Sequence, residues 1–164
     1  MLLRLLAFCS FSLTLSPSTA IADMIFNTPL AVWANEAIVA TYTYDYQNFI
    51  PEQKDIAKYY TAEAWTSYSA AFTGSKIPEQ VMKNSYFVSA VALLPVEIKM
   101  IDTSHWQASV PVVVVYRNPQ FQQKQTLQVT IDFATAPQGQ GVRGLAITKF
   151  ASVVTQEPCV CKTN

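Results

Sequence analysis

Two aromatic runs organise this sequence: Tyr42-Thr43-Tyr44-Asp45-Tyr46-Gln47-Asn48-Phe49 and Tyr59-Tyr60-Thr61-Ala62-Glu63-Ala64-Trp65. Together with Trp33 they contain five of the eight tyrosines and two of the three tryptophans. Aromatic side chains bury a large apolar area, and tyrosine and tryptophan keep a polar group at one end. We predict that residues 33–65 form a helical layer that lies across a sheet built from the later part of the chain.

The composition limits the classes of protein and partner. With 164 residues the chain is long enough for one domain with appendages and a sizeable core. Eleven acidic and eleven basic side chains give a formal net charge of zero. Because nucleic acids and anionic membranes are bound through clustered basic residues, neither is expected as the main partner.

The first 22 residues have the pattern of an export signal. Arg4 provides the positive start, residues 5–15 are apolar, and Ala20-Ile21-Ala22 is an Ala-x-Ala cleavage site. The alternative is an uncleaved membrane anchor, but the apolar run is shorter than the ~20 residues of a spanning helix. We therefore predict that the protein is exported and cleaved after Ala22.

Helical periodicity begins at Trp33, after a predicted linker over residues 23–32. Pro51 is expected to end the first helix, because proline cannot continue a helix interior. Thr61 is a suitable N-cap, and the helix that it starts is expected to close at Gly74 in the left-handed conformation. Helices are predicted over residues 33–49, 52–59, 61–74 and 77–83.

After Asn84 the hydrophobic pattern changes to the alternation that is typical of strands. Pro111 lacks the N–H of a ladder bond, so we expect it at an edge or bulge, and we expect a bulge or bend near Gly144. Helices followed by antiparallel strands indicate an α+β fold with one helical layer on one curved sheet. Strands are predicted over residues 86–93, 95–101, 105–116, 125–135 and 142–154, so that the folded domain covers residues 33–154.

The sequence contains no catalytic elbow, phosphate-binding glycine loop or zinc-protease motif. Its one histidine, His105, lies three residues after Asp102. No further residue that could join them in a metal or catalytic site stands at a suitable spacing. We therefore expect His105 to be an exposed residue at the start of a strand. The prediction is a protein without enzymatic activity, cofactor or metal site.

Asp45 stands among tyrosines, and two interpretations of it are open. A fold of this kind can enclose a pocket in which a carboxylate and a tyrosine transfer protons next to a carbonyl group. Asp45, Tyr42 and Tyr46 would then line a small-molecule or isomerase pocket between helices and sheet. The interpretation that we prefer is structural, with Asp45 as a surface charge or a hydrogen-bond partner of a tyrosine hydroxyl.

The tail over residues 155–164 contains Cys159 and Cys161, which remain once the signal and its Cys9 are removed. In an oxidising compartment an even number of cysteines favours a disulfide. A bridge between residues two apart closes a small strained ring that is easily reduced. We predict first a disulfide between Cys159 and Cys161. The alternatives are a disulfide to another chain and the binding of a soft metal ion by the two thiolates.

An ordered set of short motifs extends from residue 33 to residue 153. The motifs are Trp33 with Glu36-Ala37, residues 42–49, residues 60–65, residues 88–91, Trp106 with Pro111 and Val114-Val115-Tyr116, and residues 146–150. Each is weak alone, but in this order the set resembles the IcmL/DotI family. Members of that family are inner-membrane core components of the Dot/Icm (type IVB) secretion system, and they are related to a TraM protein of I-type conjugative plasmids.

The resemblance implies a periplasmic α+β domain of the cystatin-like, nuclear-transport-factor-like type, which serves as a scaffold without an enzymatic role. Its partners would be other secretion components or further copies of the chain, and membrane contact would come through partners or an uncleaved signal. Family members carry a cytoplasmic segment and a spanning helix before this domain, whereas here a signal-like segment precedes it. The expected form is a soluble, exported IcmL-like protein that acts through protein contacts.

Overall fold

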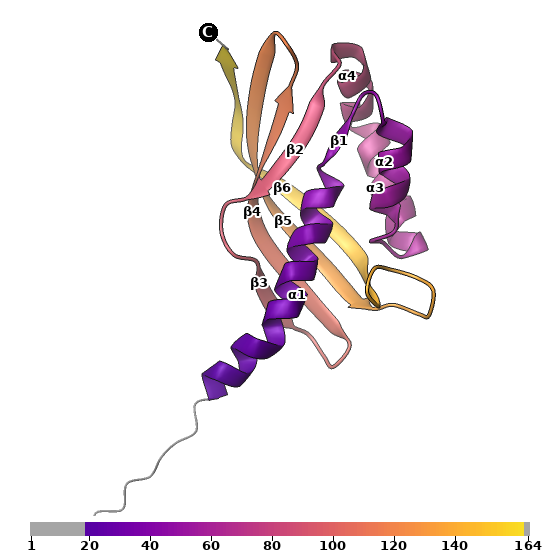
Figure 1. The fold of residues 1–164 in the computed structure, drawn as a ribbon, viewed down its shortest axis with the longest axis vertical. Helices are drawn as coiled ribbons and strands as arrows, with labels where there is room; N and C mark the ends of the chain where they lie inside the picture. Colours follow the sequence, from indigo (N-terminus) through magenta and orange to yellow (C-terminus); the bar gives the residue numbers. More distant parts are fainter. Residues whose placement is uncertain (1–18, 163–164) are drawn as a thin grey trace, which may run out of the picture.

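The chain has an α+β fold in which helices pack against a curved antiparallel sheet (Figure 1). The computed structural model describes the backbone of residues 19–162 and the side chains of residues 27–156. The helices are α1 (Thr19–Thr41), α2 (Phe49–Ala57), α3 (Ala62–Gly74) and α4 (Ile77–Asn84). The strands are β1 (Tyr44–Asp45), β2 (Phe87–Ala92), β3 (Glu97–Met100), β4 (His105–Arg117), β5 (Phe121–Thr135) and β6 (Leu145–Lys162). The predicted fold class is confirmed.

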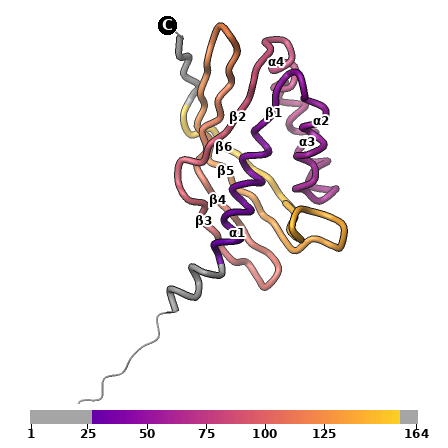
Figure 2. Tube along the Cα trace, viewed as in Figure 1, coloured from indigo at the N-terminus to yellow at the C-terminus, as the bar shows by residue number. Residues whose placement is uncertain are grey.

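The sheet has the strand order β1-β2-β4-β5-β6, and β3 pairs with β4 beyond the end of β2. Figure 2 shows how β4, β5 and β6 follow one another as long neighbouring strands. Alternate side chains of a strand point to the same face, so a strand that is covered on one face buries every second residue. The buried residues of β4 follow this rule: Trp106, Ala108, Val110, Val112 and Val114.

Pro111 lies inside β4, at the point where the strand paired with one edge of β4 changes from β2 to β3. On this edge β2 ends at Ala92 and β3 begins at Glu97, and residues 93–96 interrupt the ladder between them. The Pro111 carbonyl oxygen accepts a hydrogen bond from the Leu93 amide at 2.9 Å. In an antiparallel pair both backbone groups of a residue point to the same neighbour, so the missing N–H falls at this interruption. Pro111 therefore occupies a bulge position within the sheet.

α1 packs across the sheet through a single stripe of buried side chains. The members of the stripe are Trp33, Ala34, Ala37, Ile38 and Thr41, each at most 1% exposed. The Trp33 indole stacks on Phe133 of β5, with 5.0 Å between the ring centroids. Its Nε1–H donates to the Val142 carbonyl oxygen at 2.9 Å. One side chain thus joins α1, β5 and the loop before β6.

The predicted end of the first helix at residue 49 is wrong, because α1 ends at Thr41. Tyr44 and Asp45 form β1 and pair with β2, which buries the Tyr44 side chain. Pro51 lies in the first turn of α2, where its missing N–H removes no helical hydrogen bond. Pairing with a distant strand therefore overrides the helical periodicity of this segment.

Two more boundaries differ from the prediction. The predicted linker over residues 23–32 belongs to α1. Gly74 ends α3 without the left-handed conformation, which falls on Lys76 with φ 60°. Because only two residues separate α3 from α4, the left-handed residue that turns the chain lies directly before α4. Most of the predicted signal lies outside the described residues, and its cleavage after Ala22 stays a prediction.

β6 is longer than the predicted strand and includes most of the predicted tail. Instead of a bulge, Gly144 lies in a turn before β6, where Arg143 and Gly144 have φ 53° and 75°. The bulge falls at Thr148, because Asp132 and Phe133 of β5 face residues 149 and 147 of β6. The expected irregularity is therefore divided between a turn and a bulge four residues later.

We expect Trp33→Ala to lower the free energy of unfolding by about 3–5 kcal/mol, because it removes a buried ring and leaves a cavity against Phe133. Val32→Ala is the matched control, since Val32 is 58% exposed on the same helix, and it should change stability by less than ~0.5 kcal/mol. Urea unfolding followed by circular dichroism measures both. Equal effects in the two variants would contradict the role given to Trp33.

Candidate functional site

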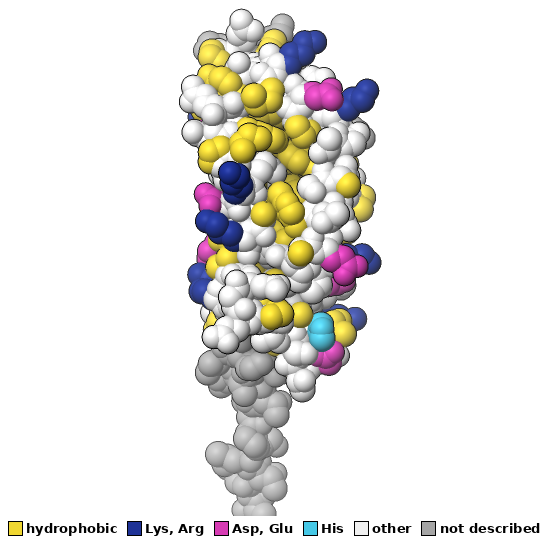
Figure 3. Space-filling view, turned by 90° about the vertical axis from the view of Figure 1, so that its right-hand side faces the viewer, with side chains coloured by type: hydrophobic (Ala, Val, Ile, Leu, Met, Phe, Trp, Pro, Cys, Tyr) yellow, Lys and Arg dark blue, Asp and Glu magenta, His cyan; other side chains and the backbone are white. Residues whose placement is uncertain are grey.

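A cavity of about 510 Å³ lies between α3 and the sheet. Figure 3 shows the side of the molecule on which α2, α3 and α4 lie, where hydrophobic side chains gather along the middle. Cavities of roughly 300–1,000 Å³ with mainly apolar walls are the usual size of small-molecule sites. The aromatic part of its lining consists of Tyr42, Tyr44, Tyr68, Phe72, Tyr116 and Phe150.

The four tyrosines of this cavity carry neutral hydroxyl groups. Burial raises the pKa of Tyr42 and of Tyr116 to about 12. Burial also raises the pKa of Tyr44 and of Tyr68, and neighbouring tyrosine hydroxyls add to both shifts. Near neutral pH all four side chains therefore stay protonated and can both donate and accept hydrogen bonds.

The structure does not bring the three predicted pocket residues into one cavity. Tyr42 lines the cavity beside α3, whereas Asp45 lines a second recess next to β2. Tyr46 packs edge-on against Phe87, with 5.5 Å between the ring centroids. The Asp45 Oδ1 accepts hydrogen bonds from the amides two and three residues later, at 2.7 and 2.8 Å. Asp45 thus holds the turn that leads into α2.

Glu52 joins Asp45 in the second recess, so that two carboxylates lie near each other. Burial raises the pKa of Glu52, as is common for a general acid. Its Oε2, however, accepts a hydrogen bond from the Asp45 amide at 2.7 Å. Because the Asp45 carboxylate accepts from the amides of residues 47 and 48 and the Glu52 carboxylate accepts from the Asp45 amide, this pair is best explained as a brace of the turn between β1 and α2.

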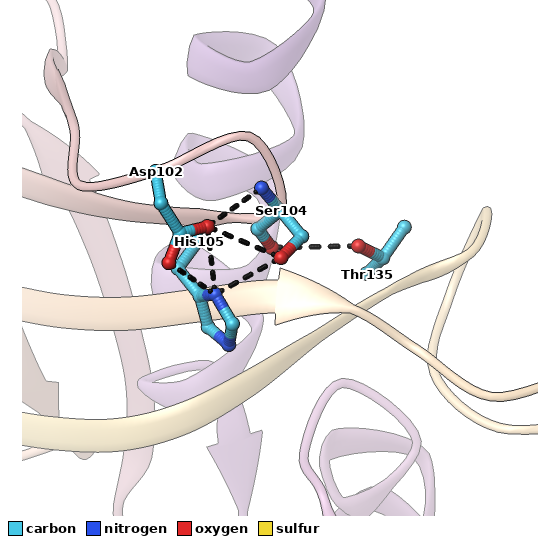
Figure 4. Close-up of polar contacts among 4 residues, drawn as sticks. All are labelled: Asp102, Ser104, His105 and Thr135. Atoms are coloured by element: carbon cyan, nitrogen blue, oxygen red, sulfur yellow. Dashed lines mark hydrogen bonds and ion pairs between the residues drawn. The ribbon is translucent and has the colours of Figure 1, made fainter.

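His105, Asp102 and Ser104 come together at the turn between β3 and β4 (Figure 4). Asp102 Oδ1 and Ser104 Oγ lie 2.9 and 3.0 Å from the same ring nitrogen of His105, Nδ1. A hydrolytic triad needs the serine and the carboxylate on opposite nitrogens of the ring. His105 is exposed at the start of β4, as predicted, and the cluster closes a turn.

A second polar cluster ties α1 to the loop before β6. Glu36 Oε1 accepts a hydrogen bond from the Tyr59 hydroxyl, and Glu36 Oε2 accepts one from Arg143 Nη2, both at 2.7 Å. These two hydrogen bonds, that of Tyr59 first, lower the pKa of Glu36. Both carboxylate oxygens are engaged, so we assign Glu36 a structural role.

Cys159 and Cys161 belong to the last part of β6, where they stand opposite Lys124 and Gln122 of β5. Their side chains lie outside the described residues, and their disulfide stays a prediction. Among the side chains described, no group of three His, Cys, Asp or Glu residues could hold a metal ion. In the described part of the chain no helix is long and apolar enough to cross a membrane.

The sequence patterns did not relate the walls of the cavity to one another. Tyr68 and Phe72 come from α3, whereas Tyr116 and Phe150 come from β4 and β6. Helical and strand periodicities show which side chains face inward, but they do not show which elements face each other. Only the tertiary structure places these rings around one space.

The comparisons with known proteins agree with this architecture. A family described as "Type-IV b secretion system, inner-membrane complex component" matches residues 22–154. The match includes the helical layer and most of the sheet, which makes the chain a type IV secretion system component. It belongs to the DotI/IcmL family.

Solved structures show the same relation. An IcmL-like type IV secretion system protein from Legionella pneumophila is 53% identical, with a TM-score of 0.77 over 81% of this chain and 96% of that one. The periplasmic domain of DotI is 24% identical, with a TM-score of 0.70 over 87% of this chain and 99% of the other. A periplasmic fragment of TraM is 16% identical, with a TM-score of 0.61 over 77% of this chain and 96% of the fragment. The last two likenesses show the shared fold. No curated protein sequence matches the chain.

The turn at Asp102 gives a prediction about pH. The Ser104 amide first, and then the His105 side chain, lower the pKa of Asp102 from 3.8 to about 2. Because folding lowers this pKa, the stabilisation from Asp102 is present above pH 3.8 and is lost as the pH falls through about 2. NMR titration of the Asp102 carboxyl carbon should give that midpoint, and His105→Ala should keep most of the shift. A midpoint at 3.8 would contradict the turn geometry.

Proposed function

We propose that this chain is a non-enzymatic, periplasmic component of a type IVB secretion apparatus that acts through protein–protein contacts. The observation that carries the proposal is the family match over residues 22–154, which spans nearly the whole described fold. The 53% identity to an IcmL-like secretion-system protein supports it. The carboxylates of Asp45, Glu52 and Asp102 accept hydrogen bonds from backbone amides in turns, which also favours a structural role.

The free edge of β6 is a surface suited to such contacts. Tyr59 and Thr61 form backbone hydrogen bonds to this edge at Ile147. Residues 151–156 are all exposed and carry no charge, with Val153 at 66% and Val154 at 44% exposure. An uncharged exposed edge strand can pair with an extended segment of another chain. We assign residues 151–156 as the contact surface, named the β6 edge below.

A small-molecule function is the second candidate, and the cavity beside α3 is the observation that favours it. Asp45 does not line that cavity, so the carboxylate needed by the isomerase hypothesis lies elsewhere. The lining carries a different carboxylate, Glu63, which is exposed, together with tyrosine hydroxyls, which are suited to binding rather than to proton abstraction at neutral pH.

Affinity purification tests the proposed contacts. In a strain with a type IVB apparatus, the tagged chain should copurify with inner-membrane components of that apparatus. Val153→Lys should reduce this recovery, because a charge on an edge strand blocks strand addition. Val91→Lys is the matched control, since Val91 is 56% exposed on β2, and it should keep full recovery. Absence of secretion components from the wild-type sample would overturn the proposal, whereas equal recovery of both variants would remove only the β6 edge from it.

The exported form and its cysteines are tested on the protein purified from the periplasm. N-terminal sequencing should begin at Asp23, the residue after the predicted cleavage site. Removal of Cys9 from the three cysteines leaves two, Cys159 and Cys161. We propose that they form a disulfide, so thiol titration should find no thiol before reduction and two afterwards. An N-terminus at Met1 would show an uncleaved signal, and two free thiols in the untreated protein would exclude the disulfide.

A further inference from the structure

The cavity beside α3 has a property that contact with a protein partner does not explain. The Tyr44 side chain is 2% exposed and lines the cavity. Among the described residues its hydroxyl has no hydrogen-bond partner, and its pKa is raised by burial and by Tyr116, Tyr68 and Tyr42 without any opposing hydrogen bond. The hydroxyl oxygen is not enclosed by protein, because the fully buried groups without a partner among the described side chains are Gln53 Nε2 and Trp106 Nε1. The group is therefore available to something that enters the cavity.

The walls of the cavity define the shape and polarity of that occupant. Tyr68 stacks on Phe72 with 5.6 Å between the ring centroids, and Phe150 meets Tyr68 edge-on at 5.4 Å. These rings form a continuous aromatic surface on the α3 side and the β6 side of the cavity. Aromatic rings pack favourably against a further ring in offset or edge-on geometry. The walls are thus suited to an aromatic ligand.

The charges of the cavity exclude strongly ionic ligands. Its lining contains one carboxylate, Glu63, and one ammonium group, Lys149, which cancel in net charge. The tyrosine hydroxyls between them are neutral. Glu63 and Lys149 are both exposed, so the enclosed part of the cavity offers a charged ligand only neutral hydroxyls and rings, and such a ligand would lose hydration there.

We propose that this cavity binds a small, neutral aromatic molecule whose oxygen atom accepts a hydrogen bond from the Tyr44 hydroxyl. Tyr68 and Phe150 provide the surface on which the ring of the ligand packs. This binding is distinct from the contacts of the β6 edge, although Ser152 belongs to that edge and also lines the cavity. A protein that copurifies with secretion components but does not bind the ligand would keep the proposed function and lose this proposal.

Binding of simple probes to the purified periplasmic protein tests the inference. Acetophenone is neutral and aromatic and has a carbonyl acceptor, so it should produce saturable changes in the amide NMR spectrum around residues 42–44, 68–72 and 150. Ethylbenzene has a similar shape but no oxygen, and it should bind more weakly. Benzoate and phenyltrimethylammonium carry a charge of either sign, and both should bind more weakly than acetophenone.

Two variants separate the roles of the cavity and of the hydroxyl. Ala71 and Ala70 are both exposed on α3, but only Ala71 lines the cavity. Ala71→Trp should therefore prevent the binding of acetophenone, and the Ala70→Trp variant should bind acetophenone as the wild type does. Tyr44→Phe should weaken the binding of acetophenone by about three- to tenfold, which is the effect of losing one hydrogen bond. The same variant should leave ethylbenzene binding unchanged, and the free protein should be at least as stable as the wild type.

Several results would overturn the proposal. One is the absence of saturable binding of acetophenone to the wild type. A second is unchanged acetophenone binding in Ala71→Trp, which would place the probe elsewhere. A third is tighter binding of benzoate or phenyltrimethylammonium than of acetophenone, which would show a site for ions. An equal loss of affinity for acetophenone and for ethylbenzene in the Tyr44→Phe variant would exclude the hydroxyl as the recognition group.

Discussion

The packing of Trp33 against Phe133 is the contact on which the arrangement of the helices depends. The ring is almost fully buried, and its N–H reaches the Val142 carbonyl oxygen. Because an unpaired buried N–H is costly, this bond favours the position of α1 in which it forms. Glu36 lies on the next turn of the same helix and binds Arg143 of the same loop. Two neighbouring turns of α1 therefore fix the loop before β6.

The position of α1 determines where α3 begins, and this in turn creates the cavity. The hydroxyls of Thr41 at the end of α1 and of Tyr60 before α3 lie 3.0 Å apart. Tyr60 also forms a bridge to Ile147 of β6. α3 therefore starts at the edge of the sheet and leaves a tyrosine-lined space beside β6. Beyond Ile147 the exposed β6 edge extends past this space, so the cavity and the proposed contact surface are neighbours on one strand.

The sequence predicted the inward face of the long strands better than the boundaries of the elements. In β4 each inward residue is recognisable from alternation alone, because the strand is covered on one face along its length. Tyr44 is compatible with both a helical stripe and a strand, and its pairing with Val88, far away in the sequence, decides for the strand. Gly74 shows the same limit, since the distance to α4, not the glycine itself, determines that Lys76 takes the left-handed conformation.

By itself the sequence determined the succession of a helical part and a strand part, the α+β class and the family, because all three depend on local patterns along the chain; the short β1 between α1 and α2 was not predicted. Only the tertiary structure decided that Asp45 holds a turn while Tyr42 lines a cavity. It also decided that Tyr68, Tyr116 and Phe150, from three separate elements, surround one space. The physical reason is that periodicity specifies which face of an element is buried, whereas the neighbours of each side chain are selected by packing between segments that are distant in the chain.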